Sequence, residues 1–287
     1  MPTSPDSRLD ILFILAHPDD ESFGNAGILS WAAANGIRVG LVCATRGEVG
    51  EISDPSLGTP ETLGAVRERE LRTAMATAGV DALRLLPYRD SGMAGTPPND
   101  DPRSLVQASR EAVLADVVFH IRDLQPQIVV TFGPDGVYGH PDHIRIGEIA
   151  TEAVTVAASD ELAYLGASWK THQLFHVAIA REDLLEANLT VGGLFSNTPR
   201  EVVATWGIPR AEITHIFDVS AFVPQKLEVM RCHATQLPFN ADSGGDEIPG
   251  MRPWLSRESM VKKQLPWTNH TDEFSVLDTF NSLELKS

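Results

Sequence analysis

Four short apolar runs alternate with helical patterns in the first half of the chain, and this alternation constrains the fold more than any other feature. Each run is continuously apolar, which is typical of strands buried on both faces of a parallel sheet. The runs span Ile11–Ala16, Val39–Ala44, Ala82–Leu86 and Gln127–Phe132. Because strands that alternate with helices form right-handed βαβ units, we predict an α/β fold with a Rossmann-like, mostly parallel sheet flanked by helices.

Helical spacing fills the gaps between and after these runs, over residues 24–35, 63–78, 105–124 and 143–158. Beyond residue 160 the pattern weakens, although residues 174–180 and 213–219 have the composition of strands and residues 224–236 that of a helix. Residues 240–253 are rich in Gly, Asp, Ser and Pro, which predicts a loop and makes this segment a candidate for a mobile lid.

The chain has 287 residues, of which 43% are hydrophobic, and no clear linker divides it. This length suits one large α/β domain. We therefore expect a single domain over residues 1–287, with a core over about 10–160. A C-terminal region, about 161–287, is expected to pack on this core and to shape the substrate pocket.

Charge and hydropathy exclude several kinds of partner. The formal net charge of −16 disfavours binding to nucleic acid or to an anionic membrane surface, since both need a local excess of cations. No apolar stretch reaches the ~20 residues of a spanning helix, so we expect no integral membrane segment. The N-terminus lacks the pattern of a signal peptide. Cys43 and Cys232 form no CxxC pair and are expected to be reduced, consistent with a cytoplasmic protein.

The first apolar run ends abruptly at His17, Pro18, Asp19, Asp20 and Glu21. Carboxylates crowded at the end of a buried strand repel one another and resist desolvation, so the cluster is costly unless something binds there. A divalent cation removes both problems, because imidazole nitrogen and carboxylate oxygen are ordinary zinc ligands. The alternative is a helix N-terminus capped by Asp19 or Asp20, since acidic residues are favoured at helix starts.

A second polar motif follows the fourth run and includes Tyr138, His140, Asp142 and His143. Its alternative is a plain polar turn after a strand. Catalytic zinc commonly uses three protein ligands and a water molecule, and His17, Asp20 and His143 can supply those ligands. Because polar residues follow several strands on one predicted edge of the sheet, the two motifs are expected to meet there.

The remaining side chains of the two motifs suggest an acid and a base. Asp19 is expected to stay beside the water and to take its proton as general base. His140 can stabilise the oxyanion of a tetrahedral intermediate, and Tyr138 can add a second donor or deliver a proton to a leaving amine. Asp142 can hold an imidazole, that of His140 or His143, in one tautomer by accepting its second N–H.

The paired motifs HPDDE and GHPDH resemble those of the LmbE-like family of zinc-dependent N-deacetylases, also called the PIG-L family. The resemblance extends over residues 10–160 and is looser beyond them. It implies the removal of an acetyl group from an N-acetylglucosamine-type substrate, a small-molecule amino sugar. The family includes deacetylases of N-acetylglucosaminyl inositol compounds and amidases of mycothiol conjugates.

The resemblance also implies three substrate-binding residues, Arg67, Asp90 and Glu48. Arg67 is similar to a family arginine that grips sugar hydroxyls, although a run of Arg and Glu is equally typical of a solvated helical face. Asp90 is similar to a carboxylate that reads the hydroxyls of the amino sugar, and the alternative is a turn residue. Glu48 matches an acidic position near the pocket. His233 can reach the site from the C-terminal region or serve as a surface or packing residue.

The leading hypothesis is a zinc-dependent hydrolase that removes acetate from an N-acetylglucosamine-type sugar. A close alternative cleaves a larger amide, such as a thiol conjugate, with the same residues. A third is a non-catalytic, metal-dependent sugar-binding protein, against which the extra carboxylate of Asp19 argues. A metallophosphoesterase is disfavoured because such enzymes commonly use two metals and the sequence shows one ligand set. Fe²⁺ suits two His and one Asp as well as Zn²⁺ does, and an oligomer is compatible with the sequence.

Overall fold

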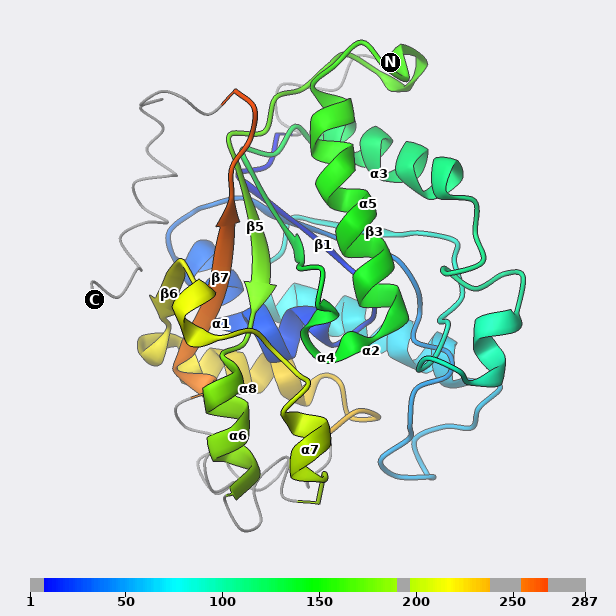
Figure 1. Ribbon diagram of the computed structural model, residues 1–287, viewed down its shortest axis with the longest axis vertical. Helices are drawn as coiled ribbons and strands as arrows, with labels where there is room; N and C mark the ends of the chain where they lie inside the picture. The colour runs from blue at the N-terminus through cyan, green and yellow to red at the C-terminus, as the bar shows by residue number, and fades with distance from the viewer. Residues whose placement is uncertain (1–7, 190–196, 238–253, 268–287) are drawn as a thin grey trace.

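The computed structural model describes residues 8–189, 197–237 and 254–267, which contain a seven-stranded sheet (Figure 1). The strands are β1 Ile11–Leu15, β2 Val39–Cys43, β3 Ala82–Leu85, β4 Ile128–Phe132, β5 Gln173–Ala178, β6 His215–Asp218 and β7 Arg257–Lys263. Their order in the sheet is β3-β2-β1-β4-β5-β7-β6. Figure 1 shows β7, in orange, beside β5, in green. The last described strand of the chain is therefore inserted between β5 and β6.

Two groups of helices cover the sheet. The helices are α1 Asp20–Ala34, α2 Leu63–Ala78, α3 Arg110–Leu124, α4 Gly136–Gly139, α5 Pro141–Ala157, α6 Arg181–Leu189, α7 Arg200–Val203 and α8 Val223–Arg231, with 3-10 turns at Pro97–Asp100, Ala163–Leu165, Arg210–Glu212 and Ser220–Phe222. α1, α2 and α8 pack against one another, and α3 packs against α5. Right-handed crossovers place these two groups on opposite faces, because the chain runs outward from β1 to β3 and then returns to β4.

The predicted fold class is confirmed. β1 pairs in parallel with β2 on one side and with β4 on the other, while β3 and β5 extend the parallel order outward. Every residue of β1, β2 and β4 is buried, as their continuous apolar sequences require.

The C-terminal region adds β5, β6 and β7 to the same sheet. β7 pairs antiparallel with both β5 and β6, and the sequence patterns did not predict it. The sequence of β7 does not alternate between apolar and polar residues, because one of its buried side chains is the carboxylate of Glu258. α6 and α7 were also not predicted. α3 begins at Arg110 rather than at residue 105, since the hydroxyl of Ser109 accepts the N–H of Ala112 at 3.3 Å and caps the helix there.

Three smaller expectations concern the membrane, the lid and the thiols. Within the described ranges, no helix is long and apolar enough to cross a membrane. The candidate lid, residues 240–253, lies outside the described residues. Cys43 is buried, Cys232 is half-buried, and both are free thiols.

The strand order reverses direction between β1 and β4, and this reversal locates the site. From β1 the chain continues to β2 and β3 on one side, whereas β4 and β5 lie on the other. In open α/β sheets, ligands bind outside the carboxyl ends of the strands at such a reversal. The register pairs Ile11 with Ile128 and Phe13 with Val130, so β1 and β4 end at the same edge. The HPDDE and GHPDH motifs therefore emerge from neighbouring strands.

Replacing Gly147 of α5 by Ala is expected to destabilise the protein. A Cβ at this position would lie 2.5 Å from the carbonyl oxygen of Phe132 and 3.0 Å from its carbonyl carbon. Because both atoms belong to the backbone of β4, α5 has to move outward and carry His143 with it. Overpacking of this kind costs about 1–3 kcal/mol, which thermal unfolding measures as a lower Tm.

Gly24→Ala is the matched control for that substitution. Gly24 also lies within a helix, but a Cβ there would meet only a methyl group of Val177, at 3.8 Å. Alanine is the better helix former, so this variant should keep or raise the Tm. A Tm for Gly147→Ala equal to that of the wild type would contradict the close approach of α5 to β4.

Candidate active site

The three predicted metal ligands lie together where β1 and β4 end. His17 follows β1, Asp20 begins α1, and His143 lies in the first turn of α5. His17 Nδ1 is 3.1 Å from His143 Nε2, and carboxylate oxygens of Asp20 lie 3.7 Å from the former and 3.2 Å from the latter. Bonds of ~2.1 Å in a tetrahedral site place ligand atoms ~3.4 Å apart. The three separations are of this size, with the two Asp20 distances measured to different oxygens of its carboxylate.

Hydrogen bonds on the far side of each imidazole leave the inward nitrogen free for a metal. His17 Nε2 lies 3.2 Å from Asp142 Oδ2 and 3.5 Å from Asp90 Oδ1, which places the proton on Nε2 and leaves Nδ1 free. His143 Nδ1 donates to the carbonyl oxygen of Gly136 at 3.2 Å, which leaves Nε2 as its ligand atom. Outer hydrogen bonds of this kind are typical of metal-binding histidines and fix their tautomers.

The carboxylate of Asp142 contacts His17, whereas the sequence led us to expect His140 or His143 as its partner. The same carboxylate accepts the backbone N–H of Ser91 at 2.9 Å and the hydroxyl of Ser91. Asp142 lies in the first turn of α5 and faces across to the residues after β1 and β3. Only the N–H of Asp142 is directed to His140, whose Nδ1 accepts it at 3.2 Å.

Two overlapping groups of buried side chains also have ligand atoms within 4.8 Å of one another. One contains His17, His140 and His143, and the other contains His17, Asp90 and Asp142. Both include His17, so they are alternatives within one centre and not separate sites. This buried His and Asp cluster can hold a metal ion.

Asp19 occupies the N-cap position of α1, yet its side chain makes no capping hydrogen bond. Its Oδ2 lies 3.0 Å from Nη2 of Arg67 instead. Burial raises the pKa of Asp19 to about 6, and the guanidinium of Arg67 opposes this rise. Asp20 does not cap the helix either, because its carboxylate accepts the N–H groups of Ala16 and His17 at 3.2 and 2.8 Å. The capping alternative for HPDDE is therefore wrong for both side chains.

Arg67 lies inside the site, so the solvated-face alternative is wrong for it. Its side chain is only 4% exposed. Nη1 donates to the carbonyl oxygen of Gly47 at 3.0 Å, and Nη2 donates to that of Pro18. Arg67 thereby holds the turn that carries Asp19, and its contact with a sugar stays a prediction.

His140 lies beside the predicted metal ligands, with 4.5 Å between its ring centroid and that of His17. Because its Nδ1 accepts the N–H of Asp142, its proton belongs on Nε2. Burial lowers the pKa of His140 to about 4, with the neighbouring His17 and His143 acting in the same direction. A neutral imidazole with Nε2–H can donate to an oxyanion. Tyr138 lies edge-on to His143, with 5.0 Å between ring centroids, on the more exposed side of the site.

Asp90 faces the predicted metal ligand His17, and Glu48 contacts the backbone of Asp90. Asp90 Oδ1 accepts the N–H of Gly92 at 2.8 Å, so Asp90 also serves as the turn residue that was its alternative. The same oxygen faces His17. A carboxylate oxygen of Glu48 accepts the N–H of Asp90 at 3.0 Å. Contacts of either carboxylate with a substrate stay predictions.

Sequence patterns missed some residues that support the site. Phe132 stacks on the ring of His143, with 4.0 Å between centroids and 9° between planes. Ser91 was detectable in principle, because it directly follows Asp90 in the polar segment after β3. His233 was named as a residue that can reach the site, but its partner was missed: its Nε2 lies 2.7 Å from Glu21 Oε1, and no local signal announces a partner 212 residues away.

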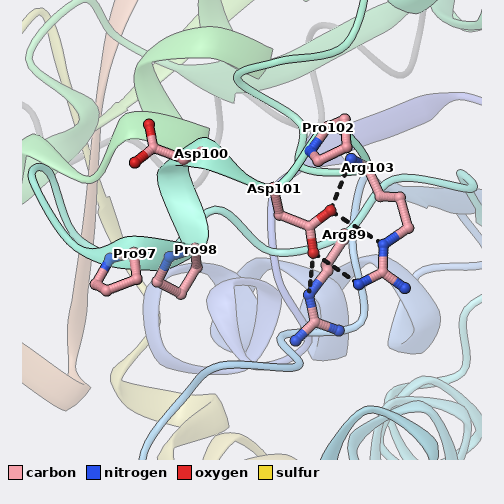
Figure 2. A pocket seen from close by; sticks show the side chains of 7 residues that line it. All are labelled: Arg89, Pro97, Pro98, Asp100, Asp101, Pro102 and Arg103. Atoms are coloured by element: carbon pink, nitrogen blue, oxygen red, sulfur yellow. Dashed lines mark hydrogen bonds and ion pairs between the residues drawn. The ribbon is translucent and has the colours of Figure 1, made fainter.

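A shallow depression with a volume of about 630 Å³ lies on the surface beside the segment that precedes Asp90. It is lined by Arg89 and by residues 97–98 and 100–103. Figure 2 shows the guanidinium groups of Arg89 and Arg103 both directed at Asp101. Because its cationic groups are already paired and no predicted site residue lines it, the depression is not the candidate active site.

Known proteins resemble this chain in sequence and in structure. The profile of the PIG-L family, described as GlcNAc-PI de-N-acetylase, matches residues 12–154. A 1D-myo-inositol 2-acetamido-2-deoxy-alpha-D-glucopyranoside deacetylase of Kineococcus radiotolerans is 36% identical, over 85% of this chain and 74% of that protein. The structure of N,N'-diacetylchitobiose deacetylase from Pyrococcus horikoshii superimposes with a TM-score of 0.60 at 21% identity, over 95% of this chain and 90% of that one.

The fold by itself does not identify the reaction. The 4-carboxy-2-hydroxymuconate hydratase of Pseudomonas putida KT2440 also superimposes with a TM-score of 0.60, at 15% identity, over 92% of this chain and 100% of that one. A hydratase and a deacetylase can thus share this architecture, since function depends on the site that a fold carries. The sequence relationship, together with the His and Asp cluster, shows that this chain belongs to the PIG-L family of de-N-acetylases.

Proposed function

We propose that the chain is a zinc-dependent N-deacetylase that removes the acetyl group from an N-acetylglucosaminyl inositol. The position of Asp19 carries this proposal. Its carboxylate is not used to cap α1 and pairs with the buried Arg67, and Asp19 lies between two of the predicted metal ligands in the chain, His17 and Asp20. A protein that only binds a metal and a sugar needs the ligands but not this extra carboxylate. The name of the Kineococcus relative supports the inositol-linked sugar as substrate.

We assign each residue of the site a separate role in the reaction. When bound, the metal supplies a Lewis acid that polarises the acetyl carbonyl and lowers the pKa of water. Asp19 accepts the proton of the attacking water, whose oxygen forms a bond to the acetyl carbon. His140 donates its Nε2–H to the oxyanion that develops on the carbonyl oxygen, and Tyr138 adds a second donor. The C–N bond then breaks, Asp19 returns the proton to the nitrogen, and the products are acetate and a free amine.

The remaining assignments follow from the surroundings of these groups. We assign Arg67, Asp90 and Glu48 to the sugar hydroxyls, because Arg67 pairs with Asp19, Asp90 faces His17, and Glu48 contacts Asp90. Two imidazole nitrogens and a carboxylate suit Zn²⁺, and Fe²⁺ is the competing ion. The two free thiols are consistent with a reducing, cytoplasmic compartment.

A substrate panel tests the proposal. Zinc-loaded protein should release a primary amine from N-acetylglucosaminyl inositol, and protein treated with a chelator should not. The panel also contains the methyl glycoside of N-acetylglucosamine, N,N'-diacetylchitobiose and a glucosaminide with a larger acyl group. Turnover of the larger amide alone would assign an amidase. Tight binding of zinc and sugar without turnover of any compound would contradict an enzyme.

A further inference from the structure

A short segment after α8 joins the two helices that hold Asp19. This segment, residues 233–236, is called the HATQ segment below. His233 contacts Glu21 of α1, as described above. The N–H and hydroxyl of Thr235 donate to the carboxylate of Glu70, in α2, at 2.9 and 2.6 Å. α2 also carries Arg67, which pairs with Asp19. The HATQ segment is thus hydrogen-bonded to α1 and to α2, and each of these helices has a side chain that contacts Asp19.

The backbone of Asp19 is in an unfavourable conformation. Its φ is 111° and its ψ is −27°, a left-handed region that residues with a side chain rarely adopt. Glycine would relieve the strain, but a general base needs a carboxylate at this position. The surrounding contacts therefore have to hold the conformation that an unconstrained Asp19 would leave.

Glu21 provides the contact that holds this backbone. Its Oε2 accepts the N–H of Asp19 at 3.0 Å. Its Oε1 accepts the hydroxyl of Ser22 at 2.6 Å and faces His233 Nε2 at 2.7 Å. The side chains of Glu21 and His233 are only 1% and 0% exposed. A carboxylate this deeply buried depends on its partners for its position, and His233 is the partner that comes from outside α1.

We propose that His233 is a positioning residue for the general base. It fixes the carboxylate of Glu21, Glu21 fixes the N–H of Asp19, and the side chain of Asp19 is thereby aimed at the attacking water. This inference rests on the proposed function, because it takes Asp19 as the base. It gives the C-terminal region a role in the chemical step in addition to any role in substrate choice.

The test compares His233→Leu with His233→Gln in the zinc-loaded, full-length protein. Leucine fills the space without a donor, whereas the amide of glutamine is long enough to present an N–H near the position of Nε2. His233→Leu should lower kcat by about 10–100-fold, as the loss of an orienting partner typically does, with KM and zinc content unchanged. His233→Gln should recover most of that kcat. A purely structural role predicts a lower Tm without this difference in kcat per folded, zinc-containing molecule.

Lys226→Met is the matched control. Lys226 of α8 and Glu258 of β7 form a second buried pair, at 2.8 Å, and Glu258 also accepts the N–H groups of Gly27 and Ile28, further along α1. Loss of this pair should lower the Tm but leave kcat close to the wild-type value, because the pair does not contact Asp19. A kcat for His233→Leu within about two-fold of wild type, or no recovery in His233→Gln, would overturn the proposal.

Glu21→Gln provides a second test should His233→Leu fail to fold. Glutamine keeps the volume but supplies one acceptor oxygen where the carboxylate supplies two, so kcat should again fall with KM unchanged. Where His233→Leu does fold, the double variant Glu21→Gln/His233→Leu should lose no more than Glu21→Gln alone, since His233 acts through Glu21. Unchanged kcat in Glu21→Gln, or fully additive losses, would contradict the inference. Absence of turnover in the wild type itself would instead reject the proposed function.

Discussion

Replacement of Asp19 by Asn is expected to lower kcat by about 10²–10⁴-fold, the usual contribution of a general base. The amide has nearly the same shape as the carboxylate but cannot accept the proton of the attacking water. The metal should stay bound, because the proposed ligands are His17, Asp20 and His143 and not Asp19. Steady-state amine release and the zinc content of the purified variant measure the two effects separately.

Asp101→Asn is the control for this substitution. Asp101 pairs with Arg89 and Arg103 at the surface depression, at 3.4 and 2.7 Å, away from the metal ligands. Its replacement should leave kcat unchanged. Equal activity of Asp19→Asn and the wild type would reject Asp19 as the base, and so would a loss of activity accompanied by a loss of zinc.

Replacement of His143 by Ala should remove the metal and with it the activity. His143 Nε2 lies 3.1 Å from His17 Nδ1 and 3.2 Å from Asp20 Oδ1, so its loss leaves two of the three protein ligands. Lewis-acid stabilisation of several kcal/mol is then lost, and kcat should fall below about one-thousandth of the wild-type value. Elemental analysis after dialysis should show less than one zinc ion per chain.

His120→Ala controls for the loss of a histidine as such. His120 lies on α3, away from the ends of β1 and β4. The His120→Ala variant should therefore retain zinc and activity. Chelator treatment of the wild type should reproduce the defect of His143→Ala, and added zinc should restore only the wild type. Retention of stoichiometric zinc by His143→Ala would show that another of the overlapping ligand groups, such as His17 with Asp90 and Asp142, holds the metal.

The sequence predicted the core of the fold but only part of its edge. β1, β2 and β4 were recognisable because strands buried on both faces have continuous apolar sequences. β7 was not recognisable, because its inward side chains include the carboxylate of Glu258. That carboxylate is tolerated inside only because Lys226 and two N–H groups of α1 lie against it. Partners of this kind come from distant parts of the chain and leave no local pattern.

Arg67 and Asp142 show a similar limit within the site. The charge pattern around Arg67 is the same for a solvated helix and for a helix that buries one arginine, so the sequence left both open. Burial against Pro18, Asp19 and Gly47 decided between them. Asp142 was recognised as an orienting carboxylate, but its partner was not, since neighbours in the sequence suggested His140 or His143.

The sequence by itself was sufficient for the parallel sheet and for the meeting of HPDDE and GHPDH at one edge. Both depend on local composition, because apolar runs have to be buried and clustered His and Asp side chains need a counter-charge. Only the tertiary structure decided which nitrogen of each imidazole is hydrogen-bonded on its outer side, that Asp142 contacts His17, and that His233 contacts Glu21. These features depend on distances of a few ångströms between residues far apart in the chain, which are determined when the helices and strands pack together.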